Sequence, residues 1–202
     1  MNLFSDLDGK KLPQGFNWLN EPEKWSFTNS VLEIVSPEKT DFFNDAEGPN
    51  SSASAPYLYT YVEGDFELTT RIDMNMTRMF DAAALLILSD MNHWAKFAYE
   101  NWLNEPSIIS VVTRTYSDDC PSLRIGTASP YLRVLRSGNC FGFHYSPDGA
   151  TWTIIRFFHM EVPERIKVGI SVQSPIGISC QAGFSFFDLK QEKIQTAKFV
   201  SI

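Results

Sequence analysis

Hydrophobic and polar residues alternate along much of this chain. Every second residue from Phe66 to Met74 points to one side, and the charged and polar residues between them point to the other, which predicts a half-buried strand. The segments 141–145 and 166–172 repeat this alternation. The run 82–88 is continuously apolar, which is typical of a strand covered on both faces, and 108–112 is a similar run of mostly β-branched residues.

Turn-forming residues separate these segments, and no window of twelve or more residues has a helical period. Asp148-Gly149 lies between segments 141–145 and 152–158, so we expect these two to form a hairpin. Ten or more short strands without helical crossovers predict antiparallel sheets packed as a two-sheet sandwich or jelly roll. The stretch 45–56, rich in Ser, Asn, Gly and Pro, is expected to be a long loop. With no repeat and no linker, we expect one domain over residues 1–202.

Charge and cysteine content narrow the classes of partner. The net charge of −7 argues against nucleic acid and against anionic membranes as main partners. The N-terminal residues 1–8 are acidic where a signal peptide is basic, and the three cysteines match no zinc motif. We therefore expect a cytoplasmic protein with free thiols. No histidine pair or glycine-rich phosphate loop is present, so we expect no metal and no cofactor.

Several motifs in order resemble a concanavalin A-like family of unknown function, which includes the yeast regulation-of-enolase protein and bacterial members encoded near polysaccharide-use genes. The matching residues are Phe16 to Pro22 with Trp25, Thr40 to Phe43, Asp81 with the run through Leu85, Trp94 to Lys96 with Glu100, Ser110 to Thr113, Ser117-Asp118, Arg136, Ser146 to Trp152, Arg156, Val168-Gly169 and Ser174-Pro175. The chain departs from the family at Phe43 and Asp119, where the family often has Trp, and at Ala84, where it often has Gly. The resemblance implies an all-β, two-sheet antiparallel jelly-roll sandwich with one concave face, and no agreed enzymatic activity.

The strongest candidate site is the segment 93–100. Trp94, Lys96 and Glu100 share one strand face by parity, and an indole, an ammonium and a carboxylate together suit a sugar ring. The alternative is a Lys96–Glu100 ion pair across a solvated face, with Trp94 partly buried beside it.

A second set of candidates is Arg133, Arg136 and Arg156. Arg156 lies in an apolar segment, so it must find a carboxylate partner or face a groove, because a buried lone charge is costly. Asp41, Asp81, Glu100 and Asp118 are the candidate partners. A structural salt bridge is one interpretation, and a site for an anionic sugar or carboxylate is the other.

The predicted ligand-binding set is therefore Trp94, Lys96, Glu100, Arg136, Arg156, Asp41 and Asp118, on one concave face. The first functional hypothesis is a non-catalytic protein that binds a carbohydrate or a small anionic metabolite. The second is a cytosolic regulatory module that contacts another protein or a second copy of itself. A glycoside-active enzyme is the third, because Glu63, Asp65 and Glu67 match a Glu-x-Asp-x-Glu pattern, although Gly64-Asp65 has the character of a turn.

Overall fold

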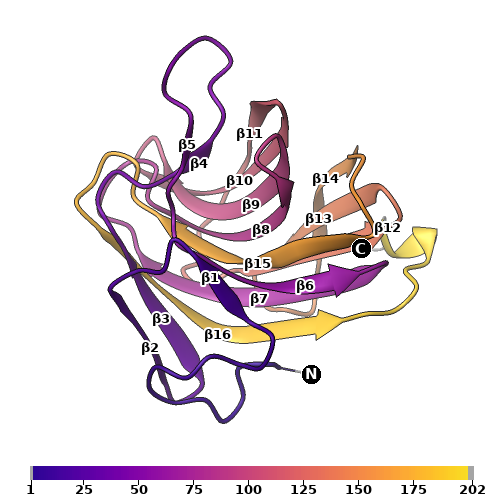
Figure 1. Ribbon diagram of the computed structural model, residues 1–202, viewed down its shortest axis with the longest axis horizontal. Coiled ribbons are helices and arrows are strands. Elements are labelled where there is room, and N and C mark those ends of the chain that lie inside the picture. Colours follow the sequence, from indigo (N-terminus) through magenta and orange to yellow (C-terminus); the bar gives the residue numbers. More distant parts are fainter. Residues whose placement is uncertain (1, 200–202) are drawn as a thin grey trace.

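The computed structural model describes residues 2–199 as two stacked antiparallel sheets of seven strands each (Figure 1). The β9 sheet has the order β1-β6-β15-β8-β9-β10-β11. Its strands are β1 (Asn17–Leu19), β6 (Tyr57–Glu63), β15 (Arg165–Gln173), β8 (Ala82–Asp90), β9 (His93–Trp102), β10 (Glu105–Arg114) and β11 (Tyr116–Arg124).

The β7 sheet has the order β14-β13-β12-β7-β16-β3-β2. Its strands are β14 (Thr153–His159), β13 (Cys140–Ser146), β12 (Tyr131–Ser137), β7 (Phe66–Asn75), β16 (Cys180–Lys190), β3 (Val31–Ser36) and β2 (Lys24–Thr28). A two-stranded sheet of β4 (Phe42–Phe43) and β5 (Ser52–Ala53) and a 3-10 helix, η1 (Thr196–Phe199), complete the described elements. The expected all-β class with two antiparallel sheets is confirmed.

The main core lies between the two sheets. Alternate side chains of both sheets meet there, and Phe97 of β9 stacks on Phe143 of β13 with ring centroids 4.7 Å apart. The predicted hairpin is present, since β13 and β14 pair antiparallel, but the register shifts between Phe143 and His144. This bulge reverses the side on which the preceding residues of β14 point.

A second apolar layer covers the outer face of the β9 sheet. Phe42 of β4 packs there against Tyr57 and Trp94, with Leu86 and Leu88 of β8 beside them. β8 is therefore buried on both faces, as its continuous apolar run predicts. The loop between β4 and β5 projects above this face, and the side chain of Asn44 anchors its foot by donating to the carbonyls of Met91 and Thr115 (Figure 1).

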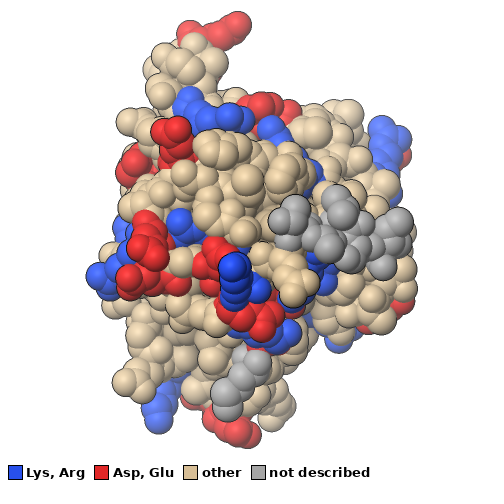
Figure 2. Space-filling model, turned by 90° about the vertical axis from the view of Figure 1, so that its right-hand side faces the viewer, with Lys and Arg blue, Asp and Glu red and all other residues tan. Residues whose placement is uncertain are grey.

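Charged side chains of both signs are interspersed on the described part of the surface that Figure 2 faces, without a continuous basic area. Within residues 2–199, no helix has the length and apolar character needed to cross a membrane. Cys120, Cys140 and Cys180 are free thiols.

Candidate functional site

A pocket of about 240 Å³ lies on the outer face of the β9 sheet, beside the covering segment that contains β4. We call it the Lys96 pocket. Its polar lining comes from Asp41, Lys96, Glu100, Asp119 and Gln173. Its apolar lining comes from Phe43, Phe80, Trp102, Val111 and Pro175.

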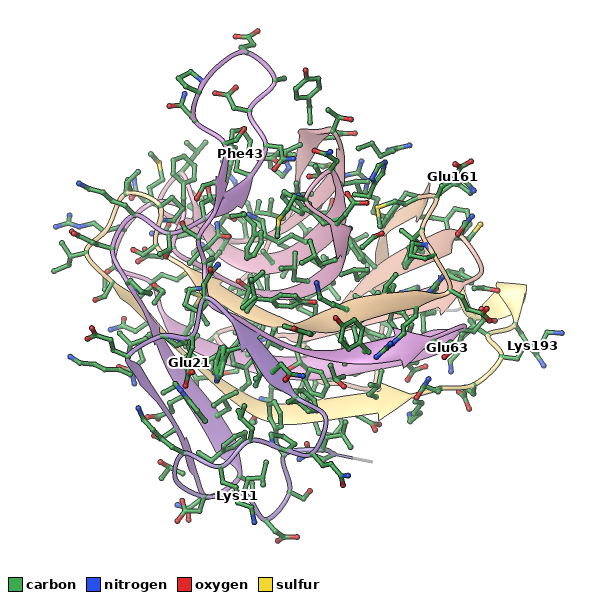
Figure 3. The ribbon with its side chains drawn as sticks, viewed as in Figure 1. Lys11, Glu21, Phe43, Glu63, Glu161 and Lys193 are labelled. Carbon is green, nitrogen blue, oxygen red and sulfur yellow. The ribbon has the colours of Figure 1, made fainter. Side chains whose placement is uncertain are left out.

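Strand parity brings the polar groups together. Lys96 and Glu100 point to the outer face of β9, whereas Ala95, Phe97 and Tyr99 point into the core. Asp119 of β11 lies opposite Val111 of β10, which in turn lies opposite Lys96, so all three share the outer face. Phe43, at the foot of the projecting loop (Figure 3), also lines the pocket.

The Lys96 ammonium ties the covering segment to the sheet. Its Nζ donates to the Phe42 carbonyl at 3.0 Å, to Gln173 Oε1 at 3.0 Å and to Asp41 Oδ1 at 3.4 Å. These three bonds use all the protons of an ammonium group. The partner of Lys96 is thus Asp41 from a distant loop, and the alternative of a Lys96–Glu100 ion pair across a solvated face is wrong, because Lys96 and Glu100 are both buried.

Two carboxyl groups in the pocket are without a hydrogen-bond partner among the described residues: those of Glu100 and Asp119. Burial raises the pKa of Glu100 to about 8, against the opposing effect of the Lys96 charge. Burial also raises the pKa of Asp119, again opposed by Lys96. Glu100 is therefore largely protonated at neutral pH, and both groups are free to bond a ligand.

Trp94 does not form the expected stacking surface. It is only 1% exposed and meets Phe42 edge-on, with ring centroids 6.1 Å apart. The expectation of a partly exposed indole platform at Trp94 is wrong, because the segment around β4 folds over it. The indole that does line the pocket belongs to Trp102, which packs against Phe80 at 5.6 Å.

Arg136 lies away from the Lys96 pocket, at one end of the β7 sheet. Its guanidinium donates to the carbonyls of Gly138, Pro163 and Glu164 at 2.8–2.9 Å. By parity it shares the core side of β12 with Leu132 and Val134. The expectation that it lines the same face as Lys96 is wrong; its bonds are structural ones to loop carbonyls.

Arg156 and Asp118 also lie elsewhere, at the open side of the sandwich where β14 and β11 are edge strands. Arg156 Nη2 donates to Asp118 Oδ2 at 3.0 Å, and Nη1 reaches the Ser110 carbonyl at 3.4 Å. Because of the bulge, Arg156 pairs with the core-facing Phe143, whereas Ile154 is exposed. The salt-bridge interpretation of Arg156 is thus the one that the structure shows, and the expectation that it faces the same hollow as Lys96 is wrong.

Comparison with known proteins gives the chain a family. A family profile described as "Protein of unknown function (DUF1349)" matches residues 18–192. The chain belongs to the DUF1349 family. Regulation of enolase protein 1 from Saccharomyces cerevisiae (strain ATCC 204508 / S288c) is 24% identical over 180 residues, which cover 89% of this chain and 90% of that protein. The resemblance drawn from the motifs is confirmed.

Solved structures show how widely the DUF1349 fold is shared. A crystal structure of a functionally unknown protein from Saccharomyces cerevisiae superposes with a TM-score of 0.83 at 22% identity, covering 88% of this chain and 97% of that chain. The GH43 BlXynB protein from Bacillus licheniformis superposes with a TM-score of 0.74 at 14% identity, and the match covers 93% of this chain but 38% of that one. LamAcat from Zobellia galactanivorans superposes with a TM-score of 0.63 at 11% identity, and the match covers 94% of this chain and 96% of that chain. At these identities the likeness shows the fold alone.

Sequence reasoning missed several residues of the Lys96 pocket in this DUF1349 protein. Asp119 faces the pocket, and its neighbour Asp118 does not. Parity along β11 would have distinguished these two residues only if the β10–β11 register had been known. Phe43 and Asp119 are the two positions where the family often has Trp, and both line this pocket. Gln173 and Phe80 carried no local signal, since distant parts of the chain bring them to β9.

The Glu-x-Asp-x-Glu pattern does not assemble near the Lys96 pocket. Glu63 ends β6 at the far side of the molecule from Phe43 (Figure 3), and Gly64 adopts a φ of 76° in the turn that follows. The Asp65 carboxylate accepts a hydrogen bond from the Gly138 amide at 2.8 Å. Glu67 pairs with Lys190 and Lys198. Asp65 and Glu67 are thus held by structural contacts.

Proposed function

We propose that this protein binds a carbohydrate or another small polyhydroxylated metabolite in the Lys96 pocket, without a catalytic role. The observation that carries the proposal is that two carboxyl groups without a hydrogen-bond partner among the described residues, the buried Glu100 and the exposed Asp119, lie beside an aromatic wall in one pocket. Glu100 and Asp119 offer oxygens to ligand hydroxyls, and Trp102 and Phe43 offer apolar surface to the C–H face of a sugar ring.

The size and charge of the pocket narrow the ligand class. Drug-sized ligands occupy roughly 300–1,000 Å³, so a pocket of about 240 Å³ suits one sugar ring rather than an oligomer. Three acids surround the single ammonium of Lys96, whose protons are already bonded. A neutral or amine-bearing ligand therefore fits this pocket better than the anion expected from the sequence.

The test is calorimetric titration with glucose, galactose, mannose, xylose and glucosamine. We expect saturable binding of at least one of these, with an Asp119→Asn variant weaker by about tenfold or more, because a hydrogen bond to a charged group contributes roughly 1.5–3 kcal/mol. Asp118→Asn is the matched control, since Asp118 lies on the same strand but pairs with Arg156 outside the pocket. Absence of binding, or equal loss in both variants, contradicts the proposal.

Turnover is tested in the same protein with chromogenic glycosides. A protonated, buried carboxyl such as Glu100 is also a feature of general acids. Release of the chromogen that disappears in Glu100→Gln would replace the binding proposal by a glycoside-active enzyme. We expect no release.

A second candidate function is a cytosolic regulatory protein that acts through a protein partner. The name of its yeast relative, Regulation of enolase protein 1, favours it. The projecting loop between β4 and β5 offers an exposed contact surface, anchored through Asn44. Adding the protein to an enolase assay tests this candidate, and a variant with residues 46–49 replaced by glycine and serine tests the loop. An unchanged enolase rate contradicts it.

A further inference from the structure

The outer face of the β7 sheet holds a second cavity, of about 570 Å³, on the opposite side of the sandwich from the Lys96 pocket. Strands β7, β12 and β16 form its floor, and the β13–β14 turn forms one wall. We call it the Arg133 pocket. The residues that matter here are Glu67, Arg71, Tyr131, Arg133, Trp152 and Lys190.

Arg133 is a buried cation that lacks a hydrogen bond or ion pair in the described part of the chain. It is 8% exposed, and none of its nitrogens donates a hydrogen bond or forms an ion pair within residues 2–199. Its guanidinium lies over the ring of Trp152, whose centroid is 4.2 Å from the guanidinium carbon. A buried guanidinium normally bonds carboxylates or carbonyls, as Arg136 and Arg156 do in this protein. Arg133 therefore faces the cavity with its donors unused.

The acids of the Arg133 pocket are engaged elsewhere. Glu67 pairs with Lys190 and Lys198. The Asp148 carboxylate accepts the amides of Ala150 and Thr151 within its own turn, each at 2.8 Å. Asp188 pairs with Lys190. Neither Glu67 nor Asp148 is within ion-pair distance of Arg133, and the charge of Glu67 acts on Arg133 only at longer range.

A second arginine completes the arrangement. Arg71 of β7 lies opposite Tyr131 of β12 and sits over its ring at 5.7 Å, while Arg133 lies opposite Thr69. Arg71 and Arg133 are thus diagonal neighbours on one sheet face, and residues so placed lie about 7–8 Å apart. Two guanidinium groups at that spacing are able to converge on one oxyanion between them.

We propose that the Arg133 pocket is a second ligand site, which binds the carboxylate or phosphate group of a small metabolite between Arg133 and Arg71, with Tyr131 and Trp152 as its aromatic walls. The β16 strand shifts register between Phe184 and Phe186 at the edge of this pocket, and such bulges are frequent beside binding sites. The anionic ligand that the sequence led us to expect is thus proposed for the Arg133 pocket, on the sheet opposite the Lys96 pocket.

The experiment is a titration of the protein with inorganic phosphate and, separately, with acetate, followed by calorimetry and by tryptophan fluorescence. Trp152 touches Arg133, so binding is expected to change the fluorescence of the protein but not of a Trp152→Phe variant. Arg133→Gln and Arg71→Gln are each expected to weaken binding by about tenfold or more. The phosphate and acetate arms decide which oxyanion the pocket prefers.

Arg165→Gln is the matched control. Arg165 sits over the Tyr61 ring at 4.1 Å, a similar cation–aromatic pair, but it belongs to the other sheet. We expect the Arg165→Gln variant to bind phosphate and acetate as the wild type does. The same is expected of Asp119→Asn, which changes the Lys96 pocket. Arg71 is exposed, so its variant folds even where Arg133→Gln loses stability, which thermal unfolding monitors. The proposal is overturned if neither anion binds saturably, or if binding persists in the Arg71 variant and in folded Arg133→Gln.

Discussion

Replacing Glu100 by glutamine should stabilise this protein at neutral pH. Glu100 is 4% exposed and accepts no hydrogen bond within residues 2–199. Burial raises the pKa of its carboxyl from an ordinary 4.5 to about 8, even though Lys96 is nearby. Glutamine has nearly the same shape but cannot ionise, so the folded state keeps its packing without having to hold a proton.

The size of the effect follows from proton linkage. Between about pH 4.5 and pH 8 the folded protein keeps a proton on Glu100 that the unfolded chain has released, so stability falls as the pH rises through this window. The loss is about 1.4 kcal/mol for each pH unit. At pH 7 it amounts to about 3 kcal/mol, and at pH 5 to less than about 1 kcal/mol. Above pH 8 both states are ionised and the loss stays constant.

Urea unfolding of the wild type and of Glu100→Gln across this pH range is the assay. The gap in unfolding free energy between the two proteins should widen from pH 5 to pH 8. The stability of the variant still falls as the pH rises, because burial also raises the pKa of Asp119. Glu105→Gln is the control: Glu105 pairs with Arg124 at the surface, and its loss should change stability by less than about 1 kcal/mol.

One result would refute this reasoning. If Glu100→Gln were less stable than the wild type at pH 7 and the difference vanished toward acid pH, then Glu100 would be ionised and stabilised in the folded state. The pocket would then hold a paired carboxylate, and its assignment as a free group for a ligand would fail with it.

Two further comparisons test the packing around the sites. The Trp94→Ala variant should lose about 3–5 kcal/mol of stability, because it leaves a cavity in the core. Trp102 is only half-buried, so Trp102→Ala should lose clearly less stability in the same thermal unfolding assay. Equal losses in the two variants would show that Trp102 is a core residue. Gly169→Ala should lose at least about 1–3 kcal/mol, because a Cβ there would lie 1.9 Å from the Leu58 carbonyl oxygen of the neighbouring strand. Gly126→Ala meets no heavy atom within 4 Å and should be neutral in chemical denaturation, and a neutral Gly169→Ala would mean that β6 and β15 separate easily.

The sequence determined the fold class and the faces of the strands. The two-residue period decides which side chains of β7, β9 and β15 enter the core, since successive residues of a strand point to opposite sides. The same rule placed Lys96 and Glu100 together. It is a local rule, so it holds wherever the strand is regular, and it does not hold across the bulge in β14, which adds one residue against β13 just before Arg156.

Only the tertiary structure decided what each face meets. Trp94 and Trp102 lie on the same side of β9 by parity, but the segment around Phe42 covers the first and leaves the second at the pocket. Parity puts Arg133 and Arg136 on opposite faces of β12, but it does not show that the first meets an open cavity and that loop carbonyls bond the second. Such outcomes depend on strand order and on which distant loops lie over each sheet, and local periodicity holds no information about either.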